Sequence, residues 1–416
     1  MAEDAAKAKF RNPFRPGAGH MPPYLAGREE ETREFNRLLE QDIILENLIL
    51  SGLRGLGKTV LLDTFKPMAI QAGWLWVGAD LSEATSVSDE NLATRIITDL
   101  SVVTSSIVVA REVLPRYGLT HQTETVETKL DYGLLQEVFA HTPGLVADKL
   151  KAVLELAWSH INPLGKRGII FAYDEAQNLA DHAAKEQYPL SLLLDVFQSL
   201  QKKEVPFMLA LTGLPTLFPK LVEARTYSER MFRVIFLEPL NKVETIQAIK
   251  KPIDKAACPV KLSDTSIETI WETTKGYPYF IQYVCREVYD VWVQHNEAGL
   301  PPPGVPVGAI IRKLDSDFFA GRWARATDRQ RDLLAVISVL PNCAAEFTVQ
   351  DVVECSSRLS PDKPFSNSHA NQMLASLSEA GLVYRNRHGK YSFAVPLLGE
   401  FIRRQMRPKK SVAGAD

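Results

Sequence analysis

The sequence predicts an α/β fold in which helices cover both faces of a parallel sheet. Five apolar runs without regular polar alternation begin at Asn47, Trp74, Arg167, Pro206 and Arg233. Segments with helical periodicity lie between these runs, and the longest covers residues 88–160. A glycine-rich loop follows the first run. Strands that are buried on both faces read as continuous apolar runs. Alternation of such strands with helices is typical of a parallel sheet.

Composition indicates a soluble globular protein that lies in the cytoplasm. The 416 residues suffice for two or three domains, and 45% are hydrophobic, 24% are charged and the net charge is −2. No apolar run has membrane-spanning length, the N-terminus has no signal-peptide core, and no internal repeat is evident. No C-x-x-C pair is present, which favours reduced, packing thiols. The cysteines are Cys258, Cys285, Cys343 and Cys355.

The loop after the first strand matches the phosphate-binding pattern G-x-x-x-x-G-K-[ST]. Gly52, Gly57, Lys58 and Thr59 are in register, and a helical sequence follows directly. Such a loop directs backbone N–H groups at one anion, and the following helix offers its positive end. Lys58 is expected to reach the β- and γ-phosphates, and the Thr59 hydroxyl to bind Mg²⁺. The predicted nucleotide-binding loop comprises Gly52, Leu53, Arg54, Gly55, Leu56, Gly57, Lys58, Thr59 and Val60.

Polar residues end the next strands, where ligands bind in open α/β sheets. Asp174 and Glu175 follow the run "IIFAY". Asp174 is expected to hold Mg²⁺ directly or through water, and Glu175 to polarise the attacking water. Thr212 closes the following run. It is either a sensor of the γ-phosphate or an ordinary strand-end cap.

The second half of the chain changes character. Residues 241–297 read as helices only, and "GLPPPGVPVG" reads as a linker or ordered loop. Helices near 328–340, 348–356 and 366–380 then precede a hairpin with its turn at His388-Gly389. That order is typical of a winged helix-turn-helix. The predicted domains are an arm (1–22), a P-loop ATPase domain (23–240), a helical lid (241–298), a linker (299–325), a winged-helix domain (326–408) and a tail (409–416).

Five motifs occur in a familiar order: "YLAGREEE", "GLRGLGKT", "IIFAYDE", "LALTG" and "GYPYF". Over about residues 24–295 the chain thereby resembles AAA+ ATPases, near the bacterial and archaeal origin-recognition-type and STAND groups. The resemblance implies that Gly27 and Arg28 lie beside the adenine pocket, and that Gly276 and Pro278 approach the base or ribose. From sequence alone, "GYP" is equally an inter-helix turn.

The resemblance also implies an oligomer in which a neighbouring subunit supplies an arginine. Such an arginine neutralises charge on the transferred phosphoryl group. Arg225, Arg230 and Arg233 precede the fifth strand, and Arg230 best matches the family position. The chain departs from the family because Arg286 comes late for a lid arginine. It also lacks the repeat array of the larger STAND proteins.

Basic residues gather in the predicted wing and tail. Between Tyr384 and Lys410, one acid, Glu400, accompanies eight basic residues: Arg385, Arg387, Lys390, Arg403, Arg404, Arg407, Lys409 and Lys410. This charge favours duplex DNA, bound chiefly through Arg385, Arg387 and Lys390. The preceding helix begins with polar side chains that suit base edges: Asn367, Ser368, His369 and Asn371. Winged helices also serve protein contacts, so a protein partner remains the alternative.

These features predict an ATPase that converts ATP and water to ADP and phosphate with Mg²⁺. Its nucleotide state is expected to control assembly, DNA engagement, or both. Two alternatives stay open. One is a STAND-like switch that is held autoinhibited around ADP. The other is a non-enzymatic adaptor that carries nucleotide as a structural component.

Overall fold

The chain folds into two compact units in the computed structural model. One unit comprises residues 28–52 and 58–237, and the other comprises residues 1–27, 53–57 and 238–416. The structure describes residues 12–17, 19–115, 123–258, 261–301, 303–341, 343, 345–387 and 389–406. Much of the predicted arm and the tail, with Arg407, Lys409 and Lys410, lies outside the described residues, as does His388 of the predicted turn.

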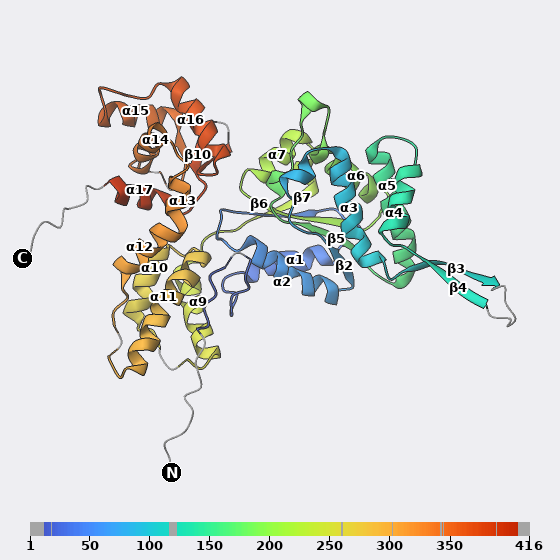
Figure 1. Cartoon of the computed structure of the whole chain (residues 1–416), viewed down its shortest axis with the longest axis horizontal. Coiled ribbons are helices and arrows are strands. Elements are labelled where there is room, and N and C mark those ends of the chain that lie inside the picture. Colours follow the sequence, from blue (N-terminus) through green and yellow to red (C-terminus); the bar gives the residue numbers. More distant parts are fainter. Residues whose placement is uncertain are drawn as a thin grey trace, which may run out of the picture. The chain divides into compact units, whose positions relative to one another are not determined.

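A five-stranded parallel sheet forms the centre of the first unit, in the order β2-β5-β6-β1-β7 (Figure 1). The strands are β1 (Asn47–Ser51), β2 (Trp74–Val77), β5 (Gly168–Tyr173), β6 (Phe207–Gly213) and β7 (Phe232–Phe236). Every residue of β1, β5 and β6 is buried, as the apolar runs at their centres predict. The parallel register directs the carboxyl ends of β1, β5 and β6 to one edge.

Helices cover both faces of this sheet (Figure 1). α1 (Glu29–Leu39) and α2 (Lys58–Gln71) lie on one face, where Phe35 of α1 stacks on Phe65 of α2 with ring centroids 4.1 Å apart. The other face packs against α3 (Asp89–Thr104), α5 (Val146–Ile161) and α6 (Pro189–Lys202), with α4 (Tyr132–His141) outside them. Two short helices, α7 (Leu217–Ala224) and α8 (Ser228–Met231), lead into β7.

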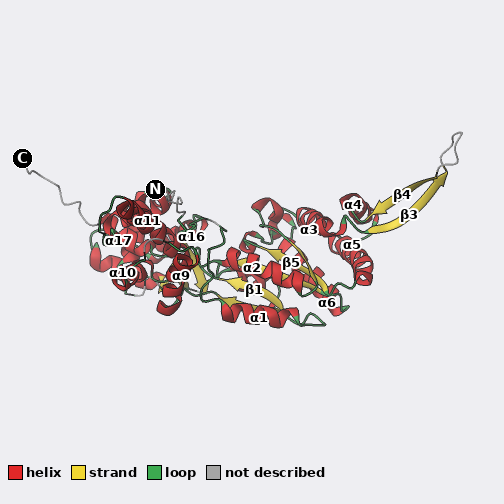
Figure 2. Cartoon of the chain, turned by 90° about the horizontal axis from the view of Figure 1, so that it is seen from below, coloured by secondary structure: helices red, strands yellow, loops and turns green. Residues whose placement is uncertain are grey.

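The prediction of helix throughout residues 88–160 is wrong over part of its length. β3 (Val108–Pro115) and β4 (Thr123–Lys129) form an antiparallel hairpin that projects from this unit (Figure 2). Residues 116–122 between them lie outside the described part. The sequence "TETVETK" is rich in β-branched residues, which favour a strand over a helix.

The second unit is mostly helical. It contains α9 (Lys242–Lys255), α10 (Asp264–Thr274) and α11 (Pro278–Glu297), where helices were predicted. The segment predicted as a linker over 299–325 is instead helical from Val307 to Trp323, as α12 (Val307–Leu314), a π-helical turn (Asp315–Phe319) and α13 (Ala320–Trp323). Ile310, Leu314 and Phe319 bury one side of this helix, so only its proline-rich start fits a linker.

The C-terminal part begins with α14 (Asp328–Ser338), β8 (Phe347–Thr348), α15 (Val349–Leu359) and α16 (Asn367–Glu379). It continues with β9 (Val383–Arg387), β10 (Lys390–Phe393) and α17 (Leu398–Met406). β8, β10 and β9 form a three-stranded antiparallel sheet. The helix and hairpin order follows the prediction, while α17 was not anticipated. No helix in the described ranges is long and apolar enough to cross a membrane.

Candidate functional site

The glycine-rich loop joins β1 to α2, as its sequence predicts. Gly55 and Gly57 adopt φ angles of +84° and +89°, which few other residues tolerate. Lys58, the first residue of α2, is buried and its Nζ donates a hydrogen bond to the Gly52 carbonyl oxygen over 2.9 Å. Leu56 is buried, while Val60 is half-buried in the first turn of α2. The loop therefore has the turn and the cation that phosphate binding requires.

Three of the predicted residues converge on one carboxylate. Asp174, at the end of β5, is only 5% exposed. Its Oδ2 accepts a hydrogen bond from the Thr59 hydroxyl, and its Oδ1 accepts one from the Thr212 hydroxyl at the end of β6. The backbone N–H of Glu175 also donates to Oδ1 over 2.7 Å. Residues that are far apart in the sequence thus assemble a compact group of oxygen atoms.

The neighbouring Glu175 stands in a restrained position. Its φ of +52° is uncommon for a residue with a side chain. Gln177 donates a hydrogen bond from its amide to a Glu175 carboxylate oxygen, and accepts one from the Leu214 N–H over 3.1 Å. The backbone carbonyl oxygen of Gln177 also accepts a hydrogen bond from Lys220 Nζ over 2.8 Å. Sequence reasoning missed Gln177, although its place two residues after Glu175 made it a candidate.

The oxygen donors suit a magnesium ion that retains several water ligands. Within the described ranges, no group of three or more His, Cys, Asp and Glu side chains forms a cage for a metal. Mg²⁺ usually takes one or two protein ligands and completes its shell with water and phosphate oxygens. Asp63 of α2 lies in the same acidic surroundings. Burial raises the pKa of its carboxyl. The positive charge of Lys66 opposes this shift, and the negative charges of Asp174 and Asp80 add to it, so the pKa is raised.

The residues assigned to the adenine end have structural partners of their own. Arg28 is buried and forms an ion pair with Glu31, with 3.1 Å between Nη1 and Oε1. Gly27 has φ of +61°, and a Cβ there would lie 2.5 Å from the carboxyl carbon of Glu244. These contacts account for a glycine and an arginine at these positions without reference to a ligand.

Gly276 lies in the turn between α10 and α11. Its φ is +76°, its carbonyl accepts from the Leu240 N–H over 2.9 Å, and a Cβ would lie 2.0 Å from the Leu240 oxygen. This geometry explains the glycine as part of an inter-helix turn. Pro278 begins α11, and the next N–H, that of Tyr279, donates to the Gly55 carbonyl over 3.1 Å. The start of α11 therefore contacts the tip of the phosphate-binding loop.

Arg225 and Arg230 precede β7 and Arg233 lies within it, and the three arginines differ in their surroundings. Arg225 binds Asp195 through two hydrogen bonds of 2.8 and 2.7 Å, and Arg233 binds Glu34 through two of 3.0 and 2.6 Å. Arg230 lies in α8 and is exposed. Among the described residues, its side chain makes no hydrogen bond or ion pair. The lid candidate Arg286 is exposed in α11.

The basic C-terminal cluster is smaller than the sequence indicated. Arg404 forms a two-bond ion pair with Asp315, and Arg403 donates to the Ser338 carbonyl oxygen. These two arginines stabilise the unit internally. Arg385 is exposed on β9, Arg387 ends that strand, and Lys390 begins β10 half-buried. The polar start of α16 is exposed at Asn367, Ser368, His369 and Asn371.

Comparison with solved structures establishes the fold. The Walker-type ATPase PABY2304 of Pyrococcus abyssi matches with a TM-score of 0.56 and 16% identity, over 91% of this chain and 96% of that chain. The chain has the AAA+ P-loop ATPase fold. The ADP form of the Aeropyrum pernix ORC2 protein matches the same fold, with a TM-score of 0.51, 15% identity, and coverage of 96% of this chain and 99% of that chain.

Sequence comparison adds little about activity. A family model described as a domain of unknown function (DUF8462) matches residues 316–402. No curated protein matches the chain. The structural similarity identifies the AAA+ fold. Because the sequence identities are only 15–16%, the chemistry has to be argued from the residues of the site.

Proposed function

We propose that this chain is a Mg²⁺-dependent ATPase that hydrolyses ATP to ADP and phosphate. The observation that carries the proposal is the convergence of Thr59, Asp174 and Thr212, with Glu175 alongside, after a glycine-rich loop at the start of a helix. A structural nucleotide site requires the loop alone. A carboxylate beside the metal ligands adds the group that phosphoryl transfer to water requires.

The roles follow from the chemistry of each side chain. Residues 52–60 bind the phosphates, with Lys58 as the cation. Thr59 and Asp174 hold Mg²⁺, which neutralises charge on the β- and γ-phosphate oxygens when it is bound. Thr212 orients Asp174 through its hydroxyl. At the adenine end, the proposal assigns Gly27, Arg28, Gly276 and Pro278 to the walls of the pocket.

Glu175 accepts a proton from the attacking water. In the present arrangement its carboxylate is bound by the Gln177 amide. That hydrogen bond engages one of the two carboxylate oxygens, so the other can accept from a water while Gln177 holds the side chain in place. Gln177 therefore controls the position of Glu175.

The active unit is a homo-oligomer in which Arg230 acts on the site of a neighbouring copy. Its exposure supports this role, as does the occupation of Arg225 and Arg233 by carboxylates of their own chain. DNA engagement is assigned to the C-terminal helices and hairpin. The exposed Arg385 and the basic residues Arg387 and Lys390 would contact phosphates without reading base sequence.

The substitution Glu175→Gln tests the proposed chemistry. It removes the base and retains Asp174 for the metal, so turnover should fall about 10²–10⁴-fold while ATP affinity stays unchanged. Phosphate release and nucleotide titration on the same preparation measure both quantities. Equal turnover in variant and parent would exclude Glu175 as the base. Bound nucleotide without turnover in the parent would favour the adaptor alternative.

One observation favours a second candidate, the autoinhibited switch. Within one unit, the loop tip contacts elements from the C-terminal half: the Gly55 oxygen accepts from Tyr279, and Arg54 donates to the Gly381 carbonyl over 3.5 Å. If ATP binding breaks the contact between Arg54 and Gly381, nucleotide binding would be coupled to release of the C-terminal part. Co-purified ADP together with a monomeric mass under ATP analogue would support this candidate.

A further inference from the structure

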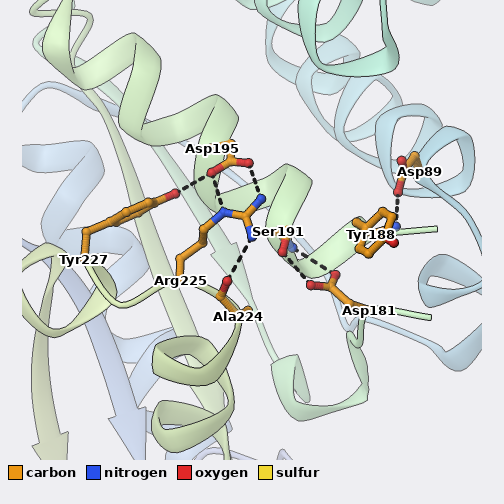
Figure 3. Close-up of polar contacts among 8 residues, drawn as sticks. All are labelled: Asp89, Asp181, Tyr188, Ser191, Asp195, Ala224, Arg225 and Tyr227. Atoms are coloured by element: carbon orange, nitrogen blue, oxygen red, sulfur yellow. Dashed lines mark hydrogen bonds and ion pairs between the residues drawn. The ribbon is translucent and has the colours of Figure 1, made fainter. Parts of the chain in front are cut away.

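Asp195 of α6 anchors the segment that carries Arg230. Both of its carboxylate oxygens accept from the Arg225 guanidinium, over 2.8 and 2.7 Å (Figure 3). Its Oδ1 also accepts from the Tyr227 hydroxyl over 2.7 Å. Arg225 Nη1 donates in addition to the Ala224 carbonyl oxygen over 2.9 Å. One carboxylate thus fixes two residues of the turn between α7 and α8.

The helix that presents Asp195 is itself held at its start. Asp181 accepts hydrogen bonds from the N–H and hydroxyl of Ser191, one turn before Asp195, and Asp89 accepts from the Tyr188 N–H over 2.8 Å (Figure 3). Ser191 is buried. The position of Asp195 is therefore determined by contacts on the side of the sheet that α3 and α6 cover.

Only a few residues separate this anchor from Arg230. Ser228 is buried and its hydroxyl donates to the Leu221 carbonyl over 3.1 Å. Met231 and Phe232 are buried in the same hydrophobic core as residues of α3, α5 and α6. Arg230 lies between these fixed points on α8 and is exposed. The anchors restrict the backbone of Arg230 and leave its side chain in solvent.

The anchor is electrostatically stable at neutral pH. Burial tends to raise the pKa of Asp195, but the hydrogen bonds from Arg225 and Tyr227 outweigh it and lower the pKa below its ordinary value of 3.8. Burial and the adjoining carboxylate raise the pKa of Tyr227, so its hydroxyl stays protonated as a donor. Because the pKa of Asp195 is lowered on folding, the pair stabilises above ordinary carboxyl pKa values and is lost only as the pH falls below them.

We infer that Asp195 is a positioning residue for the active site of a second copy of this chain. Through Arg225 and Tyr227 it fixes the backbone from which Arg230 reaches the neighbour's phosphates. The inference rests on the proposed function, because it presupposes hydrolysis at a shared site. Its physical basis is that a displacement of about 1 Å in a group acting on a transition state can cost about 10²-fold in rate.

The test uses the full chain and the substitution Asp195→Asn. The variant keeps the size of the side chain and removes the charge that holds Arg225. We expect turnover to fall about 100-fold, with unchanged ATP affinity, since the P-loop is intact. Asp315→Asn is the matched control. It breaks the ion pair to Arg404, of the same two-bond geometry, in the other unit and should leave turnover unchanged.

Mixed assemblies distinguish positioning from a general loss of structure. Co-expression of Asp195→Asn with Glu175→Gln should restore part of the turnover, because the Asp195→Asn copy keeps its Glu175 and receives Arg230 from its neighbour. Arg230→Ala with Glu175→Gln should behave the same way, and Asp195→Asn with Arg230→Ala should stay inactive. Tyr227→Phe, which removes one bond to Asp195, provides a milder variant if Asp195→Asn does not fold, with partial loss and the same complementation expected.

The outcomes separate the inference from the function beneath it. Normal turnover in Asp195→Asn overturns the positioning role alone. The same conclusion follows if Glu175→Gln restores turnover to Arg230→Ala in a mixed assembly but does not restore it to Asp195→Asn. Absence of turnover in the parent, or normal turnover in Arg230→Ala, overturns the proposed function or its shared site, and the positioning role falls with it.

Discussion

At the scale of single residues, Asp174 is the centre of the candidate site. Its carboxylate is buried and receives hydrogen bonds from α2, from its own strand end and from β6. A buried charge is tolerated only with such partners, so these hydrogen bonds serve folding as well as the metal binding that we propose.

The Thr212 hydroxyl should consequently contribute to stability. Thr212 is fully buried, and Thr212→Val preserves its shape while removing the hydrogen bond to Asp174. Since hydrogen bonds to charged groups contribute about 1.5–3 kcal/mol, the free energy of unfolding should fall by that amount in urea titrations without nucleotide. Thr212→Ser keeps the hydroxyl, so its free energy of unfolding should fall by less than that of Thr212→Val. Equal stability of the valine variant and the parent would show that this hydrogen bond is absent in solution.

The candidate residues that could be proposed from the sequence are those that belong to short, contiguous motifs. The glycines, Lys58 and Thr59 form one contiguous motif, and Asp174 and Glu175 end a recognisable strand. Gln177 and Asp195 were not predicted, although the place of Gln177 close to Glu175 was a signal. Their importance depends on contacts with Leu214 and Arg225, which only the folded arrangement of strands and helices creates.

At the scale of elements, the sheet strands were predictable because continuous apolar runs have few other uses in a soluble protein. The β3–β4 hairpin and the helix over residues 307–323 were not. A hairpin that lies outside the main sheet gives a weak pattern in the sequence, and prolines at the start of a segment obscure a helix that begins after them. Arg403 and Arg404 show a related limit, because charge alone does not distinguish an internal ion pair from a binding surface.

The β9–β10 hairpin carries the proposed DNA contacts. Replacement of Arg385, Arg387 and Lys390 by alanine should weaken duplex DNA binding about equally for all sequences. It should also flatten the slope of log affinity against log salt by about one unit for each lost phosphate contact. Titration of duplex DNA at several salt concentrations measures both effects. Absence of DNA binding by the parent at low salt would assign this part of the chain to a protein partner instead.

At the scale of the whole molecule, the two units interleave along the sequence. The loop tip, residues 53–57, groups with the C-terminal unit, while Lys58 and Thr59 belong to the sheet unit. The grouping of the loop tip with the C-terminal unit depends on long-range contacts, such as that of Gly55 with Tyr279, which the local sequence does not reveal. Nucleotide binding by the complete chain therefore tests the central claim better than either unit would.

The affinity of the full chain for ATP, compared between the parent and Lys58→Ala, is that measurement. The substitution removes the cation assigned to the β- and γ-phosphates and leaves the loop glycines in place. With about 1.5–3 kcal/mol for a charge-assisted hydrogen bond, the dissociation constant should rise about 10–150-fold in an equilibrium titration with Mg²⁺. Equal affinity in the two proteins, with both folded, would contradict the assignment of this loop to ATP.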